Sequence, residues 1–84
     1  MSILSILDNF MVNKSDYYMI ENSTKSRIYR RKWMQLEEVA FKETFNGECL
    51  EITVPIGEIQ YYTRFRLNEL DENIILNYLD NKID

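Results

Sequence analysis

The chain of 84 residues contains 45% hydrophobic and 29% charged residues, which fits one folded domain over residues 1–84 and argues against intrinsic disorder. A single cysteine excludes an intramolecular disulfide, and the absence of histidine removes the side chain most used in acid–base catalysis near neutral pH. No apolar run reaches the roughly 20 residues of a membrane-spanning helix, and the N-terminal segment lacks the features of a signal peptide. We therefore expect a cytoplasmic protein without a membrane segment.

The N-terminal segment predicts a helix over residues 2–12. Its apolar residues recur at the spacing of one helix face, and Ser2 is in place to cap the N-terminus. The polar run 13–16 ends this helix. Residues 17–21 then favour a strand, and the polar cluster 22–26 is typical of a turn.

Residues 27–37 fit two structures. Their apolar spacing favours a helix, but such a helix would carry basic residues at its N-terminus and Glu37-Glu38 at its C-terminus, which opposes the helix dipole. Pairing with residues 16–21 would instead make a β-hairpin that extends a sheet. We therefore predict a strand that continues into Val39, with a bend or bulge near Glu37-Glu38 because an unbroken strand over residues 27–45 would be unusually long.

Asn46-Gly47 lies between two alternating runs and predicts a two-residue type I′ turn between antiparallel strands. Pairing outward from this turn places Phe45 opposite Glu48, Glu43 opposite Leu50, Phe41 opposite Ile52 and Val39 opposite Val54, all on one face. The other face has Lys42 opposite Glu51, a pair of opposite charge. A slip of one residue would move every side chain to the wrong face, so this register is well specified.

Pro55-Ile56-Gly57 predicts a second turn, followed by a strand over residues 58–67. In this strand one face carries Ile59, Tyr61, Thr63, Phe65 and Leu67, and the other carries Gln60, Tyr62, Arg64 and Arg66. Residues 69–81 predict a helix, with Asn68 or Asp71 as its cap and acids in its first turn. The sequence thus predicts an α+β fold: an antiparallel meander of four to five strands whose apolar face is covered by an N-terminal and a C-terminal helix.

The motifs of catalysis and of metal binding are missing from the sequence. One cysteine and no histidine cannot make a zinc site, and no Ser, Cys or Lys stands in a recognisable nucleophile–base arrangement. The two glycines are explained by turns, whereas a phosphate-binding loop needs several glycines close together. Nothing in the pattern around Cys49 indicates an activated nucleophile, so we expect its thiol to be unreactive. We expect a protein that is not an enzyme and that needs no cofactor or metal.

Cations and aromatic rings alternate in two segments, residues 25–33 and 62–66. The net charge is −4, yet residues 25–32 contain five basic residues and no acid, while the rest of the chain has five basic and fourteen acidic residues. Tyr, Trp and Arg are the residues most enriched at the energetic centres of protein interfaces. We predict a partner-binding site that comprises Arg27, Tyr29, Arg30, Arg31, Trp33, Tyr62, Arg64 and Arg66.

Several roles fit this site. A protein partner agrees with the acidic chain, whereas a nucleic acid would use the cations for phosphates and the rings for stacking on bases. Self-association and an internally paired, merely structural surface are the remaining alternatives. The composition, rich in Ile, Asn, Tyr, Lys and Glu, is similar to that of short proteins from AT-rich bacterial or phage genomes. Small phage proteins of this kind are often non-enzymatic and bind and inhibit a host protein. We therefore predict a small protein-binding inhibitor or regulator, with a nucleic-acid-binding module as the alternative.

Overall fold

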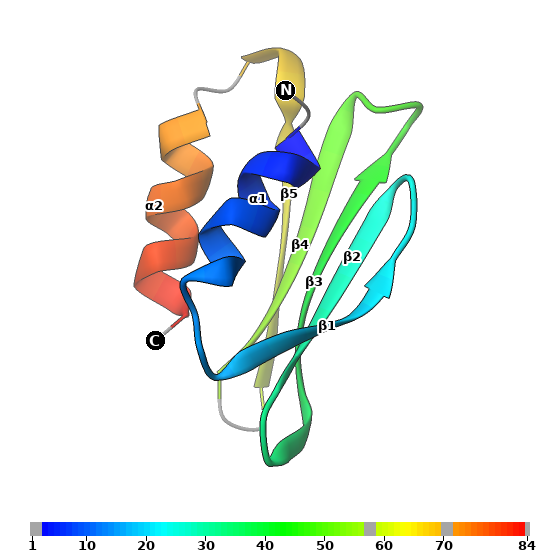
Figure 1. Ribbon diagram of the computed structural model, residues 1–84. Helices are drawn as coiled ribbons and strands as arrows, with labels where there is room; N and C mark the ends of the chain where they lie inside the picture. Colours follow the sequence, from blue (N-terminus) through cyan, green and yellow to red (C-terminus); the bar gives the residue numbers. More distant parts are fainter. Residues whose placement is uncertain (1–2, 57–58, 70–71, 84) are drawn as a thin grey trace.

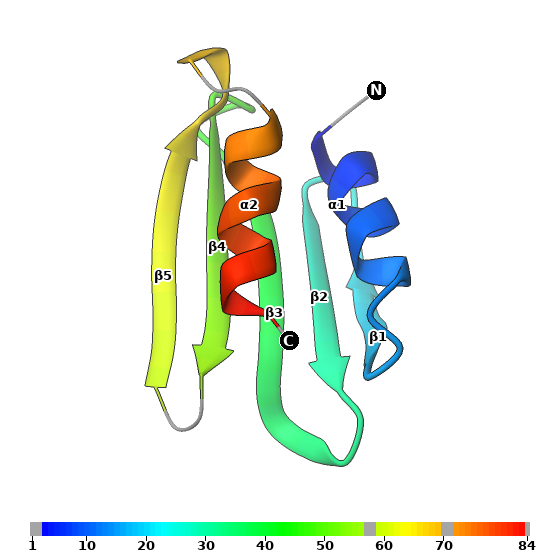
Figure 2. The same ribbon diagram turned by 90° about the vertical axis from the view of Figure 1, so that its left-hand side faces the viewer.

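The computed structural model describes residues 3–56, 59–69 and 72–83 (Figure 1). In chain order the elements are α1 (Ile3–Val12), β1 (Tyr17–Asn22), β2 (Ser26–Arg31), β3 (Met34–Thr44), β4 (Cys49–Ile56), β5 (Ile59–Arg66), the 3₁₀ helix η1 (Leu67–Glu69) and α2 (Glu72–Lys82). The five strands form one sheet in sequential order, and every neighbouring pair is antiparallel. Both helices lie on the same side of this sheet (Figures 1 and 2). The predicted meander with a helix at each end is confirmed.

The core lies between the helices and one face of the sheet. Alternation along the strands directs a single set of apolar side chains toward the helices, because successive side chains of a strand point to opposite faces. The buried set includes Leu4, Leu7 and Met11 of α1, Val39, Phe41, Leu50, Ile52 and Val54 of the central strands, and Ile75 and Leu79 of α2. Among the described residues, neither helix covers the opposite face, which we call the open face. It carries Tyr18, Arg30, Glu38, Lys42, Glu51, Tyr62, Arg64 and Arg66.

The predicted register of β3 with β4 is confirmed from Ala40–Thr53 to Thr44–Cys49, with Lys42 opposite Glu51. The ladder ends at Thr44–Cys49, so the predicted partner of Glu48, Phe45, belongs to the turn. Phe45, Asn46 and Gly47 all have positive φ, at 53°, 56° and 87°. Asn46-Gly47 therefore marked the position of the chain reversal correctly. A two-residue type I′ turn requires positive φ at Asn46 and Gly47 only, whereas here Phe45 has positive φ as well.

The prediction of one continuous strand from residue 27 past Val39 is wrong. Residues 27–31 are a strand, but the chain reverses at Lys32-Trp33, so β2 and β3 form a second hairpin. Trp33 makes this turn with φ of 65°, a region that bulky residues rarely adopt and for which Gly, Asn or Asp would be the usual signal. The pairing then shifts register between Arg30–Glu38 and Arg31–Met34, so an irregularity does lie beside the predicted Glu37-Glu38 position.

Two further boundaries differ from the prediction. Pro55 and Ile56 belong to β4 and pair with Gln60 and Ile59, so the turn follows them. The helix predicted from residue 69 begins at Glu72. Asn68, one of its predicted caps, lies within η1 and does not cap α2. Two other predicted caps, Ser2 and Asp71, lie outside the described residues, as does Gly57 of the predicted turn.

Candidate functional site

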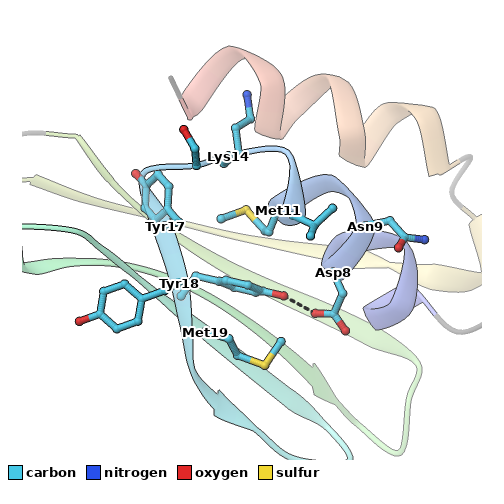
Figure 3. Close-up of a pocket in the computed structure, with 10 residues that line it drawn as sticks. Asp8, Asn9, Met11, Lys14, Tyr17, Tyr18 and Met19 are labelled. Atoms are coloured by element: carbon cyan, nitrogen blue, oxygen red, sulfur yellow. Dashed lines mark hydrogen bonds between the residues drawn. The ribbon is translucent and has the colours of Figure 1, made fainter.

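Two of the predicted site residues lie beneath α1. The Arg27 Nε donates to Asp8 Oδ2 at 3.0 Å, and the Tyr29 hydroxyl donates to Asp8 Oδ1 at 2.5 Å, the contact that is dashed in Figure 3. Tyr29 is buried and meets Phe41 edge to face. The Arg27 guanidinium also donates to the carbonyl oxygens of Ser23 and Ser26. Both side chains therefore hold α1 on the sheet and offer little surface to a partner.

The environment of Tyr29 predicts that the stability of the fold decreases at alkaline pH. Burial raises the pKa of Tyr29 above its ordinary value. The hydrogen bond to Asp8 and the negative charge of Asp8 raise the pKa of Tyr29 further. Because the pKa is higher in the folded than in the unfolded chain, this stabilisation is complete below about pH 10 and is lost as the pH rises toward the folded-state pKa. We expect the melting temperature to fall above about pH 10.

Tyr29→Phe should reduce this loss, because the variant has no hydroxyl to ionise at that position. Circular dichroism melts of the wild type and the variant over about pH 8–11 test this expectation, since that range spans the ordinary tyrosine pKa. An equally steep decline in the variant would contradict the assignment to Tyr29.

A cleft of about 420 Å³ opens between α1 and β1 (Figure 3). Its lining includes Met11, Met19, Tyr17 and Tyr29, so most of its contact surface is apolar or aromatic. Asp8 is the carboxylate in this lining, and it already accepts hydrogen bonds from two side chains. Within residues 3–56, 59–69 and 72–83, no three His, Cys, Asp or Glu side chains gather closely enough to hold a metal ion. The cleft is suited to contact with an apolar group.

The open face brings together three predicted site residues from β2 and β5 with carboxylates from the strands between them. Arg30 donates to Glu38 Oε2 at 2.8 and 3.1 Å, and Arg64 donates to Glu51 Oε2 at 2.9 and 3.1 Å. Arg64 also donates to the Tyr62 hydroxyl at 3.3 Å. The Tyr62 hydroxyl and the Arg64 guanidinium hold the pKa of Glu51 below its usual range. The open face is therefore a surface of both charges, with its arginines held in place.

Two residues that the sequence interpretation omitted belong to the same surface. Tyr18 lies opposite Arg30 across the β1–β2 ladder and is 43% exposed. Phe45 is exposed, and the Arg64 guanidinium lies 4.9 Å from its ring centroid. The strand alternation could have indicated Tyr18, but its neighbour in the next strand depends on the β1–β2 register, which shifts between Met19 and Glu21. Arg66, the remaining predicted residue of β5, is also exposed on this face.

The last two predicted residues, Arg31 and Trp33, lie at the β2–β3 turn, which we call the Trp33 turn (Arg31–Trp33). The Trp33 side chain is 91% exposed. The base of the turn is held by the Lys32 N–H, which donates to the Asp16 carbonyl at 2.7 Å, and by Arg31, which donates to Glu37 at 3.1 Å. The Trp33 ring is therefore exposed on a turn whose backbone is held in place by hydrogen bonds.

None of the described helices is long and apolar enough to cross a membrane. Comparison of the chain with protein-family models, with curated protein sequences and with solved structures gave no match.

Proposed function

We propose that the protein is a non-catalytic module that binds another protein through the Trp33 turn and the open face, and that it inhibits or regulates this partner. The observation that carries the proposal is Trp33, which is 91% exposed and has a φ of 65°. Glycine would adopt this φ without steric cost, so the turn itself does not explain a tryptophan there. A tryptophan that is unexplained by the fold and open to solvent is well suited to anchor an interface, because tryptophan is enriched among the residues that dominate binding energy.

The arginines of the open face support a protein partner over a nucleic acid. Arg30 and Arg64 each have a carboxylate within 3 Å, at Glu38 and Glu51, so an approaching phosphate would meet negative charge beside each guanidinium. The chain as a whole has a net charge of −4, which adds repulsion. A protein partner, by contrast, can present charges of both signs that complement those of the open face.

The first test is capture of the partner from a bacterial lysate by the tagged protein, with and without nuclease and at low and high salt. A stoichiometric protein that survives both treatments supports the proposal. Nucleic acid that is lost at high salt would instead establish the alternative, a nucleic-acid-binding module that uses residues 25–33 and 62–66, because phosphate contacts weaken steeply with salt.

The captured partner is then titrated against the purified protein. Trp33 is the only tryptophan in the chain, so its fluorescence reports directly on the turn. Binding should shift the Trp33 emission to shorter wavelength and protect it from acrylamide quenching. If the partner itself contains tryptophan, a peptide of the partner that lacks tryptophan is used, so that the emission comes from Trp33 alone. Arg64→Ala should weaken binding, whereas Asn77→Ala, an exposed change on α2, should not. Unchanged Trp33 emission at saturation would contradict a contact through the turn.

A further inference from the structure

The outer edge of β5 is open to pairing with another strand. Within the described sheet, β5 pairs with β4 alone. The N–H of Leu67 donates to the Glu48 carbonyl at 2.9 Å, which shows that odd-numbered residues in this register direct their backbone groups toward β4. The backbone groups of Gln60, Tyr62 and Arg64 consequently point to the outer edge, because these directions alternate along an antiparallel strand. Such a row of donors and acceptors is a template for another strand.

The two edge strands of the sheet differ in how they discourage such pairing. The register of β1 shifts between Met19 and Glu21, and a bulge of this kind makes an edge a poor template. The eight residues of β5 pair with β4 without any shift, and Ile59–Arg66 contains neither proline nor lysine. The edge of β5 thus lacks a bulge, a proline and a lysine, three features that commonly discourage strand addition.

Exposed apolar side chains line the same edge. Figure 2 shows α2 lying in front of β4, with β5 to its side. Ile59 and Tyr61 alternate with the open-face residues and so belong to the face that the helices cover elsewhere, yet they are 61% and 40% exposed. Tyr62, on the open face, is 56% exposed. A strand added at this edge would cover apolar surface on both sides of the sheet.

The sequence of β5 is complementary to itself in one antiparallel register. Pairing about a two-fold axis at Thr63 places Tyr61 opposite Phe65 of the second copy and Tyr62 opposite its Arg64. β5 contains two arginines and no acid, and in this register neither arginine faces an arginine. Pairing about Arg64 would oppose like charges, and a shift of one residue would oppose side chains from different faces.

We infer that the protein forms a symmetric dimer in which the β5 strands of two copies pair antiparallel about Thr63. The two sheets become one continuous sheet of ten strands, with the helices of both copies on one side and both open faces on the other. The dimer does not depend on the proposed function. It would, however, give one assembly two Trp33 turns, which increases the avidity for a partner with repeated sites.

Cysteine cross-linking of the full chain tests the pairing. At Thr63 the two copies would form a non-hydrogen-bonded pair, in which Cβ atoms lie roughly 4.5–5.5 Å apart, close enough for a disulfide with a small adjustment. Thr63→Cys in a Cys49→Ser background should therefore give a covalent dimer on mild oxidation. Thr53→Cys in the same background is the matched control, because Thr53 lies on a central strand. Equal cross-linking of the two variants, or none in Thr63→Cys, would overturn the proposed register.

Sedimentation equilibrium tests the dimer without any new cysteine. The wild-type mass should rise with concentration toward that of two chains. Gln60→Pro should weaken the dimer about tenfold or more, because it removes an N–H that points outward and leaves the β4 ladder intact, whereas Gln60→Ala should not. Far-UV circular dichroism checks that the proline variant is folded. A wild-type chain that stays monomeric to concentrations of about 1 mM, where even an affinity of only about 4 kcal/mol would be detected, would refute the dimer.

Discussion

Replacement of Trp33 by glycine is expected to weaken binding of the protein partner by about 30-fold or more, equivalent to about 2 kcal/mol, without lowering the stability of the fold. The loss of affinity follows from removal of an exposed aromatic anchor. Stability is retained because glycine adopts the φ of 65° at position 33 freely, whereas the left-handed region costs an L-residue roughly 1–2 kcal/mol. The greater backbone entropy of glycine in the unfolded chain offsets part of this relief, by about 0.5–1 kcal/mol. Isothermal titration with the captured partner and thermal melting measure the two effects separately.

Trp33→Phe is the matched control for this change. It keeps an aromatic ring at position 33, so it should bind the partner more tightly than the glycine variant does. It also keeps a side chain at positive φ, so it should not gain the stability that glycine gains by adopting this φ freely. Undiminished affinity in Trp33→Gly would remove the turn from the interface. A clear drop in its melting temperature would show instead that the indole ring stabilises the fold, contrary to its exposure.

Replacement of Asp8 by alanine is expected to destabilise the protein by about 2–3 kcal/mol, which corresponds to a fall of roughly 10–20 °C in melting temperature for a domain of this size. Asp8 joins α1 to β2 by accepting hydrogen bonds from both Arg27 and Tyr29. Without the carboxylate, a guanidinium side chain that is only 14% exposed loses its counter-charge, and the buried Tyr29 hydroxyl loses its acceptor. Urea unfolding followed by circular dichroism measures the change.

A double-mutant cycle separates this contact from other effects of the substitution. In the Tyr29→Phe background, Asp8→Ala should cost less than in the wild type, because one of the two hydrogen bonds is already absent. Asp80→Ala is the control for loss of a carboxylate from a helix: its contact with Lys14 is 3.8 Å long and Asp80 is exposed, so its effect should stay below about 0.5 kcal/mol. Strict additivity of the Asp8 and Tyr29 changes would contradict the shared network.

The local signals in the sequence were sufficient for the helices and for the hairpin of β3 and β4. Asn46-Gly47 supplies residues that tolerate positive φ, and the alternation on either side of it allows one register in which the apolar side chains share a face. The same alternation correctly placed Tyr62, Arg64 and Arg66 together, away from Phe65. These features depend on residues that are close in sequence, or on a pattern that repeats every two residues.

The sequence by itself thus determined the α+β class, the meander and the faces of its last three strands. Only the tertiary structure decided the course of residues 27–37, because the reversal at Lys32-Trp33 uses a tryptophan in a conformation that no local preference indicates. Alternation along β2 places Arg27 and Tyr29 on the face opposite to that of Arg30. Only the tertiary structure decided their partners: it brings Asp8, about twenty positions earlier in the chain, to Arg27 and Tyr29, and Glu38 of β3 to Arg30.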